Sequence, residues 1–224
     1  MTRRWSFSAL ETYEQCPAKY NYRYNLKLPQ PPQDPEGPLA RGNRLHTELE
    51  NYIMGAAPLH KRFDPFKAYI DAIKATRGVQ CEQLIGLDAN WKYVPDPNAP
   101  DVWLRYKLDV KIPCANPDEI RVCDWKSGRV YAGKHFDQAS LYALGMFAEH
   151  PALKRVQTEF VYLDQRSMTE HVITADAAPV LRENFEGRVI IMHEDKLHRK
   201  IPSRLCAWCD YSVSKGGPCP NTGK

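Results

Sequence analysis

Two predicted β-strands of this chain each carry an aspartate where a hairpin would bring the two carboxylates together. Asp109 lies on the alternating segment 102–112, and Asp124 follows directly on the apolar residues 120–123. Opposite residues of antiparallel strands hold their side chains about 5 Å apart, and two carboxylates at that separation repel unless a cation lies between them. Such a hairpin therefore favours a hard divalent ion, and oxygen ligands suit Mg²⁺ or Mn²⁺.

The triplet of an acid, any residue and lysine occurs three times, so the pattern alone does not identify a site. The triplets begin at Asp109, Asp124 and Glu194. Only the triplet at Asp124 lies at the end of a predicted strand and is followed by a Ser-Gly pair. Its acid and lysine would therefore lie where the strand end opens into a cleft. Lys126 lies on the same strand face as Asp124 and can orient a metal-bound water and stabilise charge on a phosphate. Ordinary surface acids in a hairpin are the alternative.

Helical and strand-like segments alternate along the chain, as expected for an α/β fold. A proline-rich loop over 28–38 separates the first two helices. The predicted helices cover residues 8–24, 39–53, 65–76, 134–149 and 177–193, and the predicted strands cover 83–91, 102–112, 120–125, 158–164 and 169–173.

Three further polar residues lie on predicted helices. His46 lies on the helix 39–53, and Gln138 and Tyr142 are one turn apart on the helix 134–149, so both can face one cleft. A lone histidine on a helix is more often packed or solvated than a ligand, so position alone gives His46 no role.

Seven cysteines is an odd number, and the N-terminus lacks the apolar core of an export signal, so a disulfide framework is a poor explanation. Metal or cluster ligation explains the C-terminal cysteines better. Cys206 and Cys209 have the spacing that wraps one metal or cluster, and Cys219 adds a third sulfur. A fourth ligand must come from elsewhere. The remaining cysteines lie in or beside apolar segments and are expected to pack as small hydrophobic residues, namely Cys81, Cys114 and Cys123.

Taken in order, these residues resemble the RecB-like branch of the PD-(D/E)XK nucleases, especially its iron–sulfur members related to the CRISPR-associated adaptation nucleases and the AddB C-terminal domain. In that family a helical histidine, an aspartate on the second strand and a D/E-x-K pair on the third build the metal site. A Q-x-x-x-Y motif follows on a helix, and the resemblance covers nearly the whole chain. It implies metal binding by His46, Asp109 and Asp124, and catalytic roles for Asp109, Asp124, Lys126, Gln138 and Tyr142. Some family members also carry a functional acid just before the first strand, where Glu82 lies, and a solvated strand-end residue is the equal alternative for Glu82.

The same resemblance implies a [4Fe–4S] cluster. Residues 10–17, which end in a Cys-Pro pair, are similar to the family's N-terminal ligand segment, so Cys16 would join Cys206, Cys209 and Cys219. Four thiolates also fit a structural zinc site, so zinc is the alternative. The nine residues between Cys209 and Cys219 exceed the usual length in the family.

The resemblance predicts a single α/β domain over residues 1–224, with a restriction-endonuclease-like core, a central mixed β-sheet flanked by helices, and a cysteine clasp joining the two ends. Its parts would be an N-terminal helical part over 1–60, a catalytic core over 80–175, and a C-terminal helix with the cysteine-rich segment over 176–224.

The implied function is that of a metal-dependent DNA exonuclease acting on single-stranded ends, in recombination, repair or CRISPR spacer processing of a phage or a bacterium. The expected partners are DNA and a helicase or CRISPR adaptation protein, because the chain carries no G-x-x-x-x-G-K-[ST] motif of its own. Homo-oligomerisation is left open. Two alternatives are a non-catalytic DNA-end-binding or partner module with a structural or redox-sensing cluster, and a zinc-stabilised interaction protein.

Composition permits this function without requiring it. The net charge of +4 is mildly basic, which suits a nucleic-acid partner but does not identify one. No apolar run reaches the roughly 18 residues of a membrane span, and the start of the chain is polar and charged. We therefore expect a cytoplasmic location and no membrane partner.

Overall fold

The computed structural model describes residues 3–32, 34–128 and 135–223. The chain divides into two compact units, one of residues 34–182 and the other of residues 3–33 together with 183–224. Each unit is described by itself below. The single domain over 1–224, with its parts at 1–60, 80–175 and 176–224, stays a prediction.

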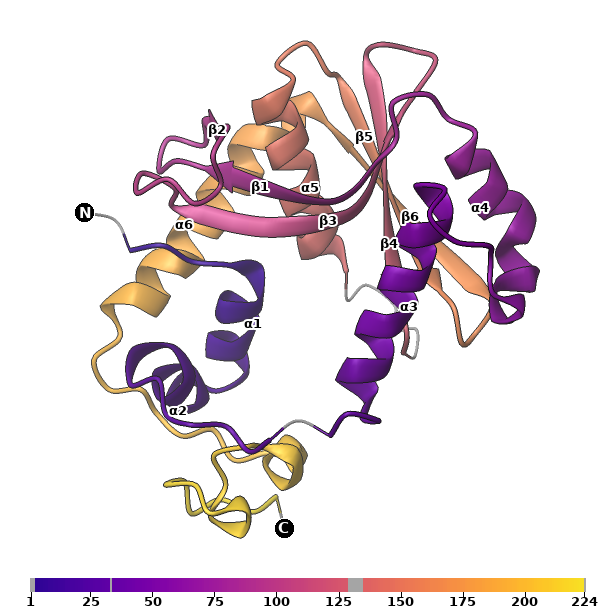
Figure 1. Cartoon of the computed structure of the whole chain (residues 1–224). Coiled ribbons are helices and arrows are strands. Elements are labelled where there is room, and N and C mark those ends of the chain that lie inside the picture. Colours follow the sequence, from indigo (N-terminus) through magenta and orange to yellow (C-terminus); the bar gives the residue numbers. More distant parts are fainter. Residues whose placement is uncertain (1–2, 33, 129–134, 224) are drawn as a thin grey trace. The chain divides into compact units, whose positions relative to one another are not determined.

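The larger unit is built on a six-stranded mixed sheet with strand order β2-β1-β3-β4-β5-β6 (Figure 1). Strands β4 and β5 are parallel, and every other neighbouring pair is antiparallel. The strands are β1 (Gln80–Leu87), β2 (Tyr93–Val94), β3 (Leu104–Pro113), β4 (Glu119–Lys126), β5 (Arg155–Tyr162) and β6 (Ser167–Thr174). This confirms the predicted α/β core with a central mixed sheet. The short strand β2 was not predicted.

Helices α3 (Pro38–Ile53) and α4 (Lys67–Lys74) cover one face of the sheet, and a 3₁₀ turn, η2 (Lys61–Phe66), leads into α4. Leu45, Leu49 and Ile53 recur at helical spacing, so they form one apolar stripe. The stripe packs with residues of α4 and with side chains of β3, β4 and β5, including Val110 and Trp125. This packing holds α3 against the strands that carry the two aspartates.

Leu49→Ala is expected to lower the free energy of unfolding by about 2–5 kcal/mol, because Leu49 is fully buried and its removal leaves a cavity. Leu39→Ala on the same helix is the matched control, since Leu39 is 58% exposed and should change stability by less than about 0.5 kcal/mol. Denaturant unfolding of the two variants measures the difference. Equal effects would contradict the described packing of α3.

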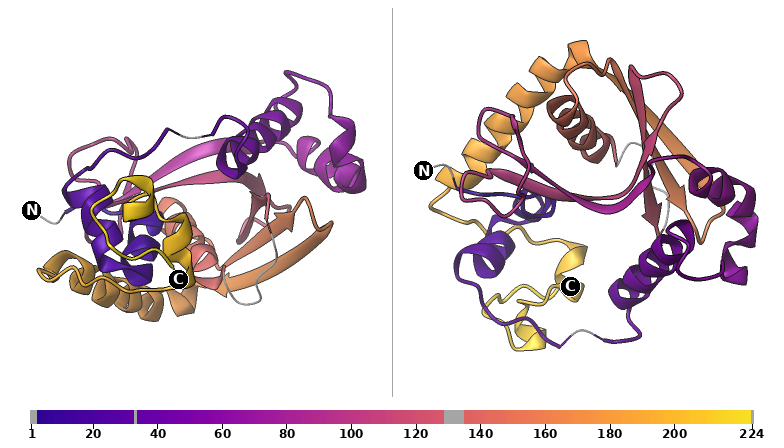
Figure 2. Two further views of the ribbon diagram at one scale, coloured as in Figure 1. Left: turned by 90° about the horizontal axis from the view of Figure 1, so that it is seen from below. Right: turned by 45° about the horizontal axis from the view of Figure 1, so that its top comes forward.

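Helix α5 (Phe136–Glu149) covers the opposite face and makes the crossover between the parallel strands β4 and β5. Figure 2 shows it within the curve of the sheet. Residues 139–147 are all buried. Gly145 allows the helix to lie close to β3, because a Cβ at this position would lie 1.6 Å from the Tyr106 hydroxyl. Close contact between α5 and the sheet brings the polar residues at the start of α5 to the strands.

The smaller unit contains α1 (Phe7–Gln15), α2 (Pro17–Tyr20), a π-helical turn η1 (Asn21–Asn25) and most of α6 (Ala178–Glu194). A single helix over 8–24 was predicted. That prediction is wrong, because Cys16 is extended at φ −164° between α1, which Ser6 caps, and α2. Pro17 explains the break, since a proline disfavours the helical conformation of the preceding residue.

Both ends of the chain take part in the smaller unit. The Arg188 guanidinium donates two hydrogen bonds to Glu14, at 2.6 and 2.9 Å, and the Tyr13 hydroxyl donates to Asp195 at 3.1 Å. The backbone N–H of Ala18 donates to Arg199. Two 3₁₀ turns, η4 (Arg204–Trp208) and η5 (Val213–Lys215), then shape the cysteine-rich segment. The first and last parts of the sequence are therefore neighbours in this unit.

Among the helices of the described residues, none has the length and apolar character needed to cross a membrane.

Candidate active site

Asp109 and Asp124 lie together at the point where the ladder between β3 and β4 ends. The last backbone pair of this ladder is Val110 opposite Cys123, so the two aspartates follow as the next pair in the same register. The carboxylate of Asp109 accepts a hydrogen bond of 2.9 Å from the backbone N–H of Trp125. Burial and the charge of Asp124 raise the pKa of Asp109, against the effect of His46. The predicted hairpin thus brings the two acids together.

His46 reaches this site from α3. Its Nδ1 lies 3.2 Å from the carboxylate of Asp109, and its Nε2 lies 2.9 Å from the carbonyl oxygen of Trp125. Burial works to lower the pKa of His46, but the hydrogen bond and the charge of Asp109 outweigh burial and raise it. The imidazole therefore lies within hydrogen-bonding distance of one carboxylate and of one backbone carbonyl.

Glu82 completes a cluster of three side chains that can hold a metal ion. The ligand atoms of His46, Glu82 and Asp109 all lie within 4.8 Å of one another, and Glu82 also forms an ion pair with Lys107. Two carboxylates and an imidazole suit Mn²⁺ and also Mg²⁺. The predicted metal set of His46, Asp109 and Asp124 stays a prediction.

The alternation of side chains between the two faces of the sheet is interrupted in β1 at Glu82. Residues two apart on a strand normally point to the same face, yet Cys81 packs against the cluster under α3 and α4 while Gln83 donates a hydrogen bond to Glu149 of α5. Glu82 lies between them with a φ of 55°, a conformation that is uncommon outside glycine. The change of face is therefore made at the residue whose carboxylate joins the metal cluster.

Strand β3 changes faces at the neighbouring position. Tyr106 packs on Tyr142 of α5, with ring centroids 5.5 Å apart, whereas Val110 packs in the cluster under α3 and α4. These residues are four apart and would share a face on a regular strand. Asp109 lies between them and, by the register of its neighbours, opposite Glu82. A local irregularity shared by two strands thus positions both acids.

Asp124 is the centre of a second group of side chains. Its Oδ1 accepts hydrogen bonds from the Tyr142 hydroxyl at 2.6 Å and from Gln138 Nε2 at 3.0 Å. Its Oδ2 lies 2.7 Å from Lys126 Nζ, which also donates to Gln138 Oε1 at 2.9 Å. The acid–lysine pair and the helical glutamine–tyrosine pair therefore form one connected network.

The surroundings of Tyr142 and of Lys126 affect this network. Burial and the charges of Asp124 and Asp109 raise the pKa of Tyr142 well above its ordinary value, so its hydroxyl stays protonated and donates. Lys126 Nζ lies 5.2 Å from the centre of the Phe160 ring. No sequence pattern pointed to Phe160, because its place beside Lys126 depends on the parallel pairing of β4 with β5.

The other two acid–lysine triplets have different partners. Lys111, two residues after Asp109, is buried and lies 2.8 Å from Glu149 at the end of α5. Asp195 accepts backbone hydrogen bonds from Leu197 and His198 just after α6. Of the three triplets, only the one at Asp124 joins an acid, a lysine and the residues of α5 in one network.

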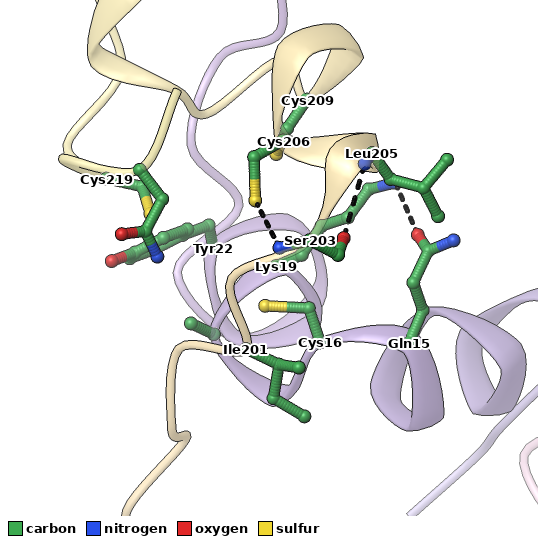
Figure 3. A pocket seen from close by; sticks show the side chains of 12 residues that line it. Gln15, Cys16, Lys19, Tyr22, Ile201, Ser203, Leu205, Cys206, Cys209 and Cys219 are labelled. Atoms are coloured by element: carbon green, nitrogen blue, oxygen red, sulfur yellow. Dashed lines mark hydrogen bonds between the residues drawn. The ribbon is translucent and has the colours of Figure 1, made fainter. Parts of the chain in front are cut away.

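The four cysteines of the predicted clasp line one pocket in the smaller unit (Figure 3). Cys16 enters it from the break between α1 and α2, and Cys206, Cys209 and Cys219 enter it from the C-terminal segment. The backbone N–H of Ser203 donates to the sulfur of Cys206 at 3.4 Å. All four are free thiols, as are the other three cysteines of the chain.

The positions of these sulfurs can be compared with those around a single zinc ion. Within the part of the chain that the structure describes, no three cysteine sulfurs lie within 4.8 Å of one another. Four thiolates around one zinc, with Zn–S distances of about 2.3 Å, would lie about 3.8 Å apart. The sulfurs are thus not in the arrangement that a single bound zinc ion requires.

Two of the three remaining cysteines pack in or against the apolar core, as predicted. Cys123 is fully buried in the apolar cluster under α3 and α4, and Cys81 packs against that cluster. Burial and neighbouring acids raise the pKa of Cys81 to about 12, which keeps its thiol neutral. Cys114 is half-buried.

Two solved structures are similar to this chain at low sequence identity. The crystal structure of SSO0001 superposes with a TM-score of 0.50 and 16% identity, covering 98% of this chain and 87% of that chain. The crystal structure of a predicted exonuclease from Eubacterium rectale superposes with a TM-score of 0.46 and 10% identity, covering 89% of this chain and 91% of that chain. Comparison with curated protein sequences gives no match.

The family comparison covers most of the chain. The family model described as PD-(D/E)XK nuclease superfamily matches residues 4–214, which include both aspartates, Lys126 and the helical glutamine–tyrosine pair. The predicted resemblance at the level of the superfamily is therefore confirmed, and this chain belongs to the PD-(D/E)XK nuclease superfamily.

Proposed function

We propose that this protein is a metal-dependent deoxyribonuclease. The observation that carries the proposal is the network around Asp124, in which Lys126, Gln138 and Tyr142 all contact one buried carboxylate. The cluster of His46, Glu82 and Asp109 lies beside it, because Asp109 and Asp124 are neighbours across β3 and β4. A metal-binding group next to a positioned lysine is the arrangement that phosphodiester hydrolysis needs.

His46, Glu82 and Asp109 would hold the metal ion, with Asp124 as a further carboxylate at its edge. The donor set fits the ion, since two of the three side chains offer carboxylate oxygens to a hard cation and the acids of this site otherwise repel one another. A bound Mg²⁺ or Mn²⁺ supplies Lewis acidity toward a phosphoryl oxygen and lowers the pKa of a bound water.

The protein side chains would position the reacting groups. Lys126 would stabilise the negative charge that develops on the phosphate. Gln138 bridges Lys126 and Asp124 by accepting from one and donating to the other, so it keeps the lysine beside the acid. Tyr142 donates to the same Asp124 oxygen and limits the rotation of the carboxylate.

The finer proposal is exonuclease action on single-stranded DNA ends, in recombination, repair or CRISPR spacer processing. A helicase or CRISPR adaptation protein would then supply the unwound strand. The mildly basic charge of the chain is compatible with a DNA partner.

We also propose that Cys16, Cys206, Cys209 and Cys219 bind a [4Fe–4S] cluster, with zinc as the alternative. Two features support metal or cluster binding. The four thiols line one pocket, and a backbone N–H is directed at one of their sulfurs. A cluster held by both ends of the chain would be structural.

The nuclease proposal predicts that anaerobically purified protein degrades end-labelled DNA with Mn²⁺ or Mg²⁺ and that EDTA stops the reaction, because the acids need the cation to activate water. Products from single- and double-stranded substrates, labelled at either end, give the polarity and the strand preference. DNA binding without cleavage in any of these metals would favour the non-catalytic DNA-end-binding module instead.

A further inference from the structure

Aromatic side chains extend from Lys126 toward the surface over β5, β6 and the start of α5. Lys126 Nζ lies 5.2 Å from the ring of Phe160, which is fully buried. His135 stacks on Phe160 with ring centroids 4.8 Å apart and an angle of 29°. His171 meets the same ring edge-on at 5.8 Å. We call Phe136, Phe160 and the histidines His135 and His171 the aromatic platform.

The outer end of the aromatic platform is open to solvent. Phe136 meets His171 at 6.0 Å, yet 45% of its surface is exposed, although it is a large apolar residue at the start of a helix. His135 and His171 are half-buried. Exposure therefore increases along the platform, from the buried ring beside Lys126 to the exposed ring of Phe136. The outer rings are the ones that a ligand can reach from solvent.

We propose that the exposed part of the aromatic platform, Phe136 with His135 and His171, binds the unpaired bases of a DNA strand whose phosphate lies at Lys126. The inference rests on the proposed nuclease function and names the part of the substrate that this function would recognise. Stacking on aromatic rings needs an accessible base face, and only an unpaired strand offers one, because base pairs stack on one another within a duplex. The platform would therefore select single-stranded DNA without selecting a sequence.

Continuity with the active site favours DNA bases over other ligands of an aromatic surface. The ring of Phe160 contacts the same lysine that would meet the phosphate, so the platform begins next to the place where a nucleotide would bind. Histidine rings stack and can also carry positive charge, which suits a polyanion. All members of the platform belong to the larger unit, which also holds the catalytic network.

The test is binding of the full chain to a short oligothymidylate that carries one 2-aminopurine, measured in EDTA and again with Ca²⁺ in place of Mg²⁺. Phe136→Ala should weaken single-strand binding by about five- to tenfold and reduce the quenching of 2-aminopurine, because one stacking surface is lost. Binding of a duplex of the same sequence should not change. Phe136→Tyr keeps a ring and should restore both signals.

Met168→Ala is the matched control. Met168 is 48% exposed on β6, but its pairing with Val161 places it on the face away from α5, so it should bind both DNAs like the wild type. Unchanged single-strand binding by Phe136→Ala, an equal loss for single strand and duplex, or no single-strand binding by the wild type in either condition would overturn the platform.

The binding assay separates the two proposals because it does not require cleavage. A wild type that binds single strands through Phe136 but cleaves no DNA with Mn²⁺ would refute the nuclease and leave the platform standing. A wild type that cleaves single strands while Phe136→Ala keeps the same KM would refute the platform alone. If both proposals hold, Phe136→Ala should raise KM about five- to tenfold with little change in kcat, as expected for loss of uniform binding.

Discussion

Asp124→Asn is expected to lower metal-dependent DNA cleavage by on the order of 10³-fold. Asparagine keeps the volume and a hydrogen-bond acceptor for Tyr142, but it removes the negative charge that faces Lys126 at 2.7 Å and stands beside Asp109. Initial rates on end-labelled DNA with Mn²⁺ measure the loss, and thermal unfolding shows that the fold is kept.

Asp118→Asn is the matched control for this change. Asp118 precedes β4 and forms an exposed ion pair with Lys154, so its substitution should leave cleavage unchanged. Mn²⁺ titration of both variants adds a second result. Weaker binding by Asp124→Asn alone would make Asp124 a metal ligand, whereas unchanged binding would limit it to holding Lys126. Full cleavage by Asp124→Asn would refute the proposed site.

Cys16→Ser is expected to have the second large effect, on stability and on colour. If Cys16 and the C-terminal cysteines share a cluster, the cluster closes a loop between positions 16 and 206, and its loss should lower stability by about 4–5 kcal/mol by analogy with a disulfide. The brown colour and visible absorbance of anaerobically purified protein should disappear, and the melting temperature should fall.

Cys114→Ser serves as the control, because Cys114 is half-buried at the end of the β3–β4 hairpin and lies outside the cysteine pocket. It should keep the colour and most of the stability. A colourless wild type with one bound zinc per chain would favour the zinc alternative, and a wild type with neither iron nor zinc would refute the clasp. An unchanged melting temperature in Cys16→Ser would refute its structural role.

Much of the fold could be predicted from local patterns. Leu45, Leu49 and Ile53 marked α3 because buried positions recur every three or four residues on a helix. The predicted strands fall within a few residues of β1, β3, β4, β5 and β6. They could be recognised because successive side chains of a strand point to opposite faces of the sheet. The two-residue strand β2 was too short to carry such a pattern. The break at Cys16 was missed although Pro17 signalled it, because the tyrosines around it keep a helical spacing.

Candidate residues were easier to name than their partners. Asp109, Asp124, Lys126, Gln138 and Tyr142 were all proposed from the chain, and the structure brings the last four into one network around a single carboxylate. Glu82 was left undecided. Its carboxylate reaches His46 and Asp109 because its φ is 55°, and no residue pattern encodes that conformation.

The sequence by itself determined most of the secondary structure, the side chains suited to metal and phosphate chemistry, and their order along the chain. Only the tertiary structure decided which of these side chains meet, because each meeting depends on strands and helices that are distant in sequence. The parallel pairing of β4 with β5 puts Phe160 beside Lys126, and the crossover by α5 puts Gln138 and Tyr142 on Asp124 rather than on solvent. Such contacts arise from packing whole elements together, which local propensity does not describe.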